Sequence, residues 1–244
     1  MKYIQEFNLP CYFYDCNRWL RTTAMLDLAQ NIAGEASRAQ GFSDSALAGL
    51  NCVWVLARMS FEYVKHPDFM CGATMQTWFR EMIGPNFIRD FRLFDNKGDR
   101  WAKDTIKLVL INKETRHICR DEELWNIIPT TPQSDDAVCE GGVEKLVIPR
   151  GSELKDLGVH KVLYSDLDYN FHVNNVKYSQ WAVDALFGNS IPERPIRKVA
   201  INFSNEATLH EDVLLQEVAL SEDEHLISGV LPDGRLCFVE KLCF

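Results

Sequence analysis

The sequence has no C-x-x-C pair among its eight cysteines and no uninterrupted apolar run of about 18 residues. Without a C-x-x-C pair no zinc site is indicated, and we expect neither a metal nor a cofactor. Without a long apolar run no transmembrane helix is expected. The N-terminal residues also lack the apolar core of a signal peptide. Reduced cysteines in a chain without such a leader indicate a cytoplasmic location.

Positive charge is also scarce. The chain carries 26 Lys and Arg against 35 Asp and Glu, which gives a net charge of −9. A nucleic-acid-binding protein normally shows a basic footprint, so no nucleic-acid partner is expected, and the same argument excludes an anionic membrane surface. The 244 residues, of which 46% are hydrophobic, are enough for one large domain or two small ones with a real core.

The first half predicts a long helix followed by four strands. The helix begins near Thr23 and ends at Gly41, because apolar residues recur between them at spacings of three and four. Runs rich in Val, Trp, Phe and Tyr predict strands, with turn residues between the last two. The predicted strands span residues 51–65, 70–83, 86–94 and 100–111.

The second half repeats this order. Asn174 is the predicted N-cap of a helix over residues 175–187, which Gly188 ends. Strands are predicted at residues 196–206, 213–221, 226–231 and 236–243. The stretch between the halves is rich in Pro and Gly and reads as a linker. The predicted division is therefore a first domain at 1–125, a linker at 126–150 and a second domain at 151–244, in an α+β fold.

The two halves can be laid on each other. Asp15-Cys-Asn-Arg-Trp19 falls on Asp168-Tyr-Asn-Phe-His172, an offset of 153 positions (168 − 15). Beyond the helices, Arg58-Met-Ser-Phe61 falls on Ala200-Ile-Asn-Phe203, an offset of 142 (203 − 61). With these offsets His172 matches Trp19, and Glu206 matches Val64. Only the second copy carries the His and the Glu; the first has a bulky aromatic and an aliphatic residue there.

Residues 165–178 read Ser-Asp-Leu-Asp-Tyr-Asn-Phe-His-Val-Asn-Asn-Val-Lys-Tyr. Asp168, Asn170 and His172 are spaced by two, so in an extended segment their side chains point to one side. A carboxylate, an amide and an imidazole beside a helix N-terminus can activate water and stabilise an oxyanion. Taken singly, the Asp and Asn would be turn or capping residues and the His a structural one.

This motif, followed by Trp181, resembles the signature of the plant and bacterial acyl-acyl carrier protein thioesterases, and the resemblance extends over essentially the whole chain. It implies a tandem hotdog fold, in which two long helices are each wrapped by a curved antiparallel sheet. It also implies that the two repeats pair side by side, and a homodimer of the whole chain is left open. The activity implied is hydrolysis of fatty acyl-acyl carrier protein, which makes acyl carrier protein the expected partner.

Carried over by position, the family's catalytic set falls on Asp168, Asn170, His172 and Glu206. Many family members have Cys after this Glu, once proposed as the nucleophile, but this chain has Ala207. We therefore expect Glu206 and His172 to activate water, and Asn170 to orient the carbonyl or donate to the oxyanion. Asp168 orients a neighbour or shares the role of base. An anhydride intermediate on a carboxylate is a competing path.

Other residues are expected to bind substrate. Asn174 and Asn175 would present the helix N-terminus to the oxyanion. The first repeat lacks the His and the Glu, so we expect it to bind the acyl chain through an apolar set: Trp54, Met59, Phe61 and Met75. Plain core packing is the alternative for these four. The acidic carrier protein needs clustered basic residues, and the candidates are Arg194, Arg197 and Lys198, or Arg89, Arg92, Lys97 and Arg100.

Three other functions compete. Hydrolysis of acyl-coenzyme A could use the same site. A hotdog dehydratase would need an Asp-x-Asn-Pro-x-His motif, but here Asn170 and His172 are one residue closer and no Pro lies between them. A non-catalytic acyl-binding module would not need the carboxylates that the second repeat retains.

Overall fold

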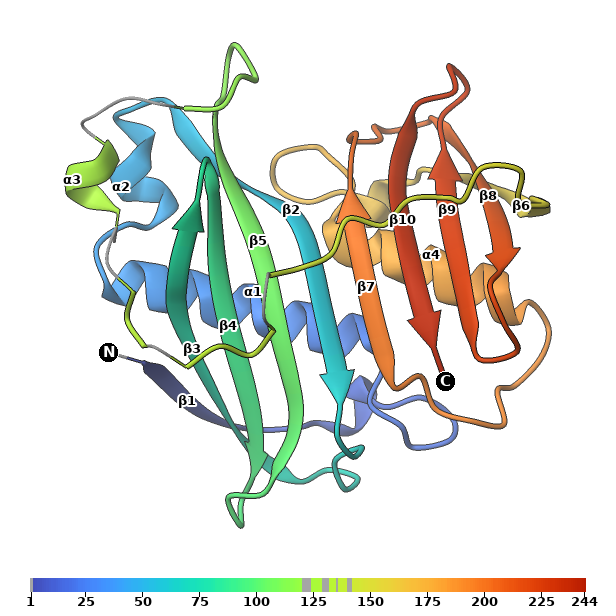
Figure 1. Ribbon diagram of the computed structural model, residues 1–244, viewed down its shortest axis with the longest axis horizontal. Coiled ribbons are helices and arrows are strands. Elements are labelled where there is room, and N and C mark those ends of the chain that lie inside the picture. Colours follow the sequence, from blue (N-terminus) through green and yellow to red (C-terminus); the bar gives the residue numbers. More distant parts are fainter. Residues whose placement is uncertain (1, 120–123, 129–131, 135, 140–141) are drawn as a thin grey trace. The chain divides into compact units, whose positions relative to one another are not determined.

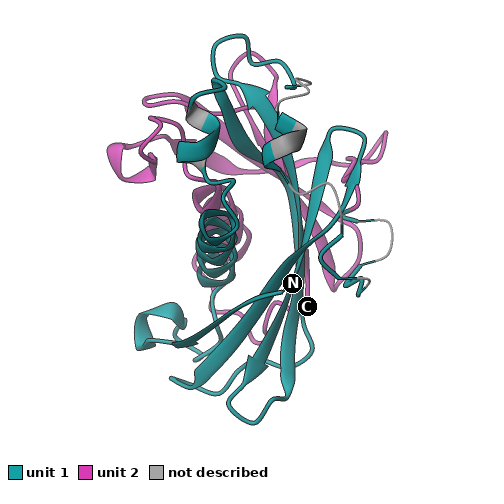
Figure 2. Ribbon diagram, turned by 90° about the vertical axis from the view of Figure 1, so that its left-hand side faces the viewer, with its two compact units in different colours: residues 1–143 teal, residues 144–244 magenta. Residues whose placement is uncertain are grey.

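Strand-forming residues dominate both halves of the chain, and each half folds into an antiparallel sheet with a helix on one face (Figure 1). The structure is a computed structural model that describes residues 2–119, 124–128, 132–134, 136–139 and 142–244. The chain divides into two units, residues 1–143 (unit 1) and residues 144–244 (unit 2), which are coloured separately in Figure 2. The functional division predicted from the sequence, with a binding domain at 1–125, a linker at 126–150 and a catalytic domain at 151–244, stays a prediction.

The described residues of unit 1 form five strands, whose order in the sheet is β1-β3-β4-β5-β2. All neighbours are antiparallel. The strands are β1 (Tyr3–Asn8), β2 (Cys52–Tyr63), β3 (Gly72–Ile83), β4 (Asn86–Asp95) and β5 (Arg100–Asn112). The helical elements are η1 (Cys11–Phe13), α1 (Thr22–Ala39), α2 (Asp44–Ala48) and α3 (Leu124–Ile127).

Unit 2 repeats this topology with the strand order β6-β8-β9-β10-β7. Its strands, again antiparallel, are β6 (Lys155–Lys161), β7 (Lys198–Phe203), β8 (Asp212–Ala219), β9 (Glu224–Val230) and β10 (Leu236–Cys243). Its helical elements are η2 (Tyr164–Asp166) and α4 (Asn175–Phe187). The five strands, the short 3-10 helix and the long helix thus recur in the same order, which agrees with the predicted internal repeat, while α2 and α3 of unit 1 have no counterpart in unit 2.

The two long helices form where the sequence predicts them. In α1, Met25, Ala29, Ile32 and Ala36 recur at spacings of three and four and are fully buried, as an amphipathic helix packed on a sheet requires. In α4 the Asn174 side chain accepts a hydrogen bond from the N–H of Val176, which confirms the predicted N-cap. Among the described residues, none of the helices has both the length and the apolar character needed to cross a bilayer.

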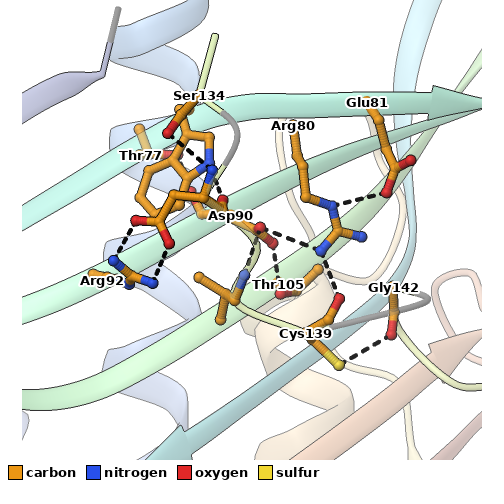
Figure 3. A network of polar contacts seen from close by, with 12 residues as sticks. Thr77, Arg80, Glu81, Asp90, Arg92, Thr105, Ser134, Cys139 and Gly142 are labelled. Carbon is orange, nitrogen blue, oxygen red and sulfur yellow. Dashed lines mark hydrogen bonds and ion pairs between the residues drawn. The ribbon is translucent and has the colours of Figure 1, made fainter. Parts of the chain in front are cut away.

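The face of the unit 1 sheet opposite α1 is covered by parts of the segment 132–143, which the sequence predicts as linker (Figures 1 and 3). Buried Asp90 is the centre of this contact. Its carboxylate accepts hydrogen bonds from the Thr105 hydroxyl at 2.7 Å and the Val138 N–H at 3.0 Å. Arg92 forms a two-fold ion pair with Asp136. These bonds fix the segment to the unit 1 sheet.

Candidate active site

Residues 167–173 of the motif fold as a tight turn, which corrects the extended segment predicted for them. Leu167 and Val173 pair as an isolated antiparallel bridge, and the Asp168 N–H donates to the His172 carbonyl at 2.8 Å. Asp168, Asn170 and His172 therefore do not alternate along a strand. They lie on one short loop between η2 and α4.

The Asp168 side chain explains this turn. Its Oδ1 accepts hydrogen bonds from the backbone N–H of Asn170 at 2.8 Å and of His172 at 3.3 Å. An Asp side chain that binds N–H groups two and four residues ahead competes with strand pairing and favours a turn. The turn also places Phe171 at a φ of 64°, an uncommon conformation for a bulky residue. Such strain persists where the surrounding hydrogen bonds impose it.

The structure brings His172 and Glu206 together. His172 Nε2 lies 3.5 Å from Glu206 Oε2, and the two side chains are 34% and 39% exposed. The two groups are thus in contact and open to water. The predicted pairing of the imidazole with this carboxylate agrees with the geometry, while the catalytic role of each residue stays a prediction.

The sequence predicted that Glu206 ends a strand, but in the structure Glu206 lies beyond the strand. Strand β7 ends at Phe203, and residues 204–211 form the connection to β8. Two hydrogen bonds hold the peptide groups of the next residue, Ala207. Its N–H donates to the Tyr178 hydroxyl at 2.9 Å, and its carbonyl accepts from the Val173 N–H at 3.2 Å. The position of Glu206 is therefore fixed through its neighbour.

Asn174 and Asn175 lie at the start of α4. The Asn174 Oδ1 atom caps the helix, and its own N–H donates to the Asp166 carbonyl at 2.8 Å. This geometry gives Asn174 a structural role, whatever its part in substrate binding. Asn175 is the first residue of the helix, where unpaired backbone N–H groups and the positive end of the helix dipole favour a negative charge.

The apolar residues predicted to bind an acyl chain are divided between two places in unit 1. Met59, Phe61 and Met75 are at most 1% exposed and belong to the core. Trp54 belongs to a separate cluster, where its ring meets that of Phe87 edge-on with centroids 4.8 Å apart. Acyl binding by these residues stays a prediction.

One predicted docking cluster for the carrier protein is only partly accessible: Lys97 and Arg100 are exposed, while Arg89 and Arg92 have partners within unit 1, and docking there stays a prediction. Arg89 is buried and its side chain donates to the Thr77 hydroxyl, so burial lowers its pKa to about 10. Arg92 is engaged by Asp136, in the network of Figure 3. Arg89 is thus shielded from a partner, and the partly exposed Arg92 already has a carboxylate partner in Asp136. In the other cluster Arg194 pairs with exposed Asp223 at 2.5 Å, a contact that a partner's carboxylates could replace.

Two groups next to the turn were not singled out from the sequence. Tyr178 of α4 is buried, and its hydroxyl accepts the hydrogen bond of the Ala207 N–H. Asp166 is buried beneath the turn, where its carboxylate accepts from the Leu163 N–H at 2.9 Å and contacts His160 Nε2 at 3.1 Å. Asp166 could have been found from the sequence, because it belongs to the polar motif. Its contact with His160 could not, because His160 lies on β6, which the sequence did not predict. Among the described residues, no group of three His, Cys, Asp or Glu side chains converges as metal ligands do.

A long helix against a five-stranded antiparallel sheet of this strand order, present twice along one chain, defines a tandem hotdog protein. Solved structures of this fold agree. An acyl-ACP thioesterase from Bacteroides thetaiotaomicron matches 100% of this chain and 97% of its own, with a TM-score of 0.80 and 21% identity. The 12:0-ACP thioesterase from Umbellularia californica matches 99% of this chain and 96% of its own, with a TM-score of 0.84 and 16% identity.

Sequence comparison narrows the class to one family. Residues 1–127 match the acyl-ACP thioesterase N-terminal domain and residues 152–230 match the acyl-ACP thioesterase C-terminal domain. The chain belongs to the acyl-ACP thioesterase family.

Curated plant relatives extend this result. The chloroplastic oleoyl-acyl carrier protein thioesterase of Coriandrum sativum is 26% identical over 233 residues, which cover 88% of this chain and 61% of the relative. A chloroplastic palmitoyl-acyl carrier protein thioesterase of Cuphea hookeriana is 24% identical over 249 residues, covering 94% of this chain and 59% of the relative. The chain thus spans about three fifths of the length of these relatives.

Proposed function

We propose that this protein hydrolyses fatty acyl-acyl carrier protein to a free fatty acid and the holo carrier protein. Membership of the acyl-ACP thioesterase family supports the substrate class. The observation that carries the chemistry is the contact of His172 Nε2 with Glu206 Oε2 at 3.5 Å, on side chains that solvent can reach. A base that is held by a second group and open to water is what hydrolysis of a thioester needs.

The reaction has three demands. The His172–Glu206 pair takes a proton from water, and the water oxygen attacks the thioester carbon. The carbonyl oxygen becomes an oxyanion, which the Asn170 amide and the N–H groups at the start of α4 stabilise. The C–S bond then breaks, and the thiolate receives the proton, a small demand because a free thiol has a pKa of about 8.5.

The hydrogen bonds of Asp168 support an orienting role for it. Its Oδ1 is engaged by two backbone N–H groups, and its Oδ2 lies 3.5 Å from the Asn170 side-chain nitrogen. A carboxylate used in this way holds the Asn170 amide and the His172 backbone. Glu206, which makes the contact with the imidazole, is then the better candidate for the carboxylate that acts on water.

Cysteine chemistry has little support in this chain. Ala207 occupies the position after Glu206 and is fully buried. Cys237 has its carbonyl bonded to the N–H of Ser204 near this loop, but burial raises the pKa of its thiol to about 12. A thiol with that pKa is almost entirely protonated at neutral pH and is a poor nucleophile.

The test is release of free thiol from acyl carrier protein loaded with a series of acyl chains. We expect turnover by the native protein, and a loss of about 10²- to 10⁴-fold in His172→Ala and in Glu206→Gln. The exposed residues His117 and Glu222 supply matched controls, His117→Ala and Glu222→Gln, which should keep full activity. The same acyl chain on coenzyme A, measured in parallel, distinguishes the carrier. Faster turnover on coenzyme A would overturn the proposed substrate.

A further inference from the structure

We infer that Tyr178 is a positioning residue for the hydrolysis, because its hydroxyl holds the Glu206 loop against His172. The inference rests on the proposed function. It adds a residue that fixes the distance between the His172 and Glu206 side chains. Tyr178 touches neither water nor substrate in this scheme and acts only through Glu206.

The Ala207 peptide is held from two sides. Its N–H donates to the Tyr178 hydroxyl at 2.9 Å, and its carbonyl accepts from the Val173 N–H at 3.2 Å. Ala207 directly follows Glu206, and Val173 directly follows His172. The two hydrogen bonds therefore join the residue after the carboxylate to the residue after the imidazole. Ala207, Val173 and Tyr178 are all buried, so water cannot replace either bond.

Tyr178 is itself well fixed. Its ring meets Trp181 of the same helix at a centroid distance of 5.2 Å, Phe238 of β10 at 5.2 Å and Phe203 of β7 at 6.0 Å. Phe203 is the last residue of β7, from which the Glu206 loop departs. The hydroxyl is thus placed by the helix that begins at the catalytic turn and by the strand that leads to Glu206.

The electrostatics agree with a neutral hydroxyl at this place. Burial raises the pKa of Tyr178, and the negative charges of Glu206 and Glu211 act in the same direction. The phenol therefore stays protonated over the whole working range of the protein. Its oxygen keeps a lone pair for the Ala207 N–H at every such pH.

The matching positions of unit 1 do not form this hydrogen bond between a tyrosine hydroxyl and the loop after the strand, which we call the hydroxyl clamp. With the repeat offset of 153 (178 − 25), the position of Tyr178 is taken by Met25, which has no hydroxyl. With the offset of 142 (207 − 65), Ala207 matches Lys65, whose N–H donates to the Trp101 carbonyl at 3.2 Å. The hydroxyl clamp is therefore found in the unit that carries the His and the Glu.

The test is a double-mutant cycle of Tyr178→Phe with Glu206→Gln, measured by steady-state hydrolysis of acyl carrier protein substrate. In the native background we expect Tyr178→Phe to lower kcat by about 10-fold or more, since small misplacements of reacting groups have effects of this size. KM should change by less than about 2-fold, because the substrate-binding surface is intact. In the Glu206→Gln background the same change should have less than about a 2-fold effect, because the group it positions is no longer functional.

Tyr14→Phe is the matched control. Tyr14 is a buried tyrosine of unit 1 whose hydroxyl donates to the Asp68 carbonyl at 2.7 Å, so its removal costs a similar hydrogen bond away from Glu206. It should leave kcat unchanged. Tyr178→Met, which copies the residue of unit 1, is the second variant should Tyr178→Phe fold poorly, and we expect it to give the same pattern.

Two results would overturn the inference: full kcat in Tyr178→Phe, or an equal loss in the native and Glu206→Gln backgrounds. The second would mean a general structural effect. These outcomes differ from failure of the proposed function, in which Glu206→Gln and His172→Ala would themselves keep full activity.

Discussion

Two turns of this molecule have the same backbone and different chemistry. In unit 1, Asp15 Oδ1 accepts hydrogen bonds from the N–H of Asn17 and of Trp19, both at 2.9 Å. In unit 2, Asp168 Oδ1 accepts the corresponding bonds, and each Asp N–H donates to the carbonyl four residues ahead, at 2.9 Å from Asp15 and 2.8 Å from Asp168. The turn therefore depends on its aspartate, and its conformation alone does not make a site.

The strained position of the turn is also shared. Arg18 has a φ of 63° and Phe171 a φ of 64°. What differs is the side chain that follows, an indole at Trp19 and an imidazole at His172, and the residue that the loop after the matching strand supplies, Val64 or Glu206. The strained conformation is therefore common to both units, and only unit 2 adds the His172–Glu206 pair that the proposed mechanism uses.

The largest difference between the two turns should appear when the matching Asn side chain is removed from each. We expect Asn170→Ala to lower turnover of acyl carrier protein substrate by about 10²-fold or more, as loss of an oxyanion donor does. Asn17→Ala, the matched change in unit 1, should leave turnover unchanged. Asn170 is exposed, so its loss should not unfold the protein, and circular dichroism checks this. Equal activity in the two variants would refute the role of Asn170.

The accuracy with which the sequence predicts the secondary structure differs between elements. The limits of α4 were predicted correctly because a capping Asn174 and a terminal Gly188 bracket the apolar stripe. Strands β2 to β5 were found because long runs of β-branched and aromatic residues lie between strong turn signals. Strands β1 and β6 were missed, since edge strands pair on one side only and carry many polar residues.

The predicted contact between His172 and Glu206 is present, but the local conformation predicted for the motif was wrong. The alternation of Asp168, Asn170 and His172 imitates a strand, but a side-chain hydrogen bond of Asp168 decides the conformation, and spacing does not reveal it. The segment read as linker is bound to unit 1 by the pair of Arg92 and Asp136, 44 positions apart. Long-range ion pairs of this kind leave no periodic pattern in a sequence.

Unit 2 also carries a fully buried acid on β10, and its titration is a second test. Burial raises the pKa of Glu240 to about 8, and a hydrogen bond from the Ser179 hydroxyl at 2.7 Å opposes the shift. A folded-state pKa above the unfolded one means that the native state holds the proton more tightly. Its contribution to stability is therefore complete below about pH 4.5 and is lost as pH rises toward about 8, at about 1.4 kcal/mol per unit of pKa difference.

Glu240→Gln should remove this dependence. We expect urea unfolding between pH 5 and pH 9 (a range of roughly four pH units, spanning the shift) to show a smaller decline in the variant than in the native protein. Glu224→Gln on the neighbouring strand is the control of opposite sign, because the hydrogen bond from Lys241 lowers the pKa of Glu224. Identical pH slopes for native protein and Glu240→Gln would contradict the prediction.

A smaller effect is expected in unit 1, where the predicted role is acyl binding. Met59→Ala and Met75→Ala remove buried volume, so each should shift preference toward longer acyl chains. A methylene in an apolar site changes relative rates by about 10- to 200-fold at most. Competition between acyl carrier protein substrates of two chain lengths measures the shift, and Met82→Ala, at a partly exposed Met of β3, is the control. Unchanged preference in both core variants would favour plain core packing.

The smallest effect should be the same in both units. Asp15→Ala and Asp168→Ala each remove a side chain that accepts two backbone N–H bonds in its turn, and each should lower the free energy of unfolding by about 0.5–2 kcal/mol, as loss of a capping side chain does. Thermal unfolding measures both. Turnover should fall only in Asp168→Ala, because only that turn carries His172. If Asp15→Ala also lost activity while remaining folded, unit 1 would contribute to catalysis through its turn, and the division of roles between the two units would have to be redrawn.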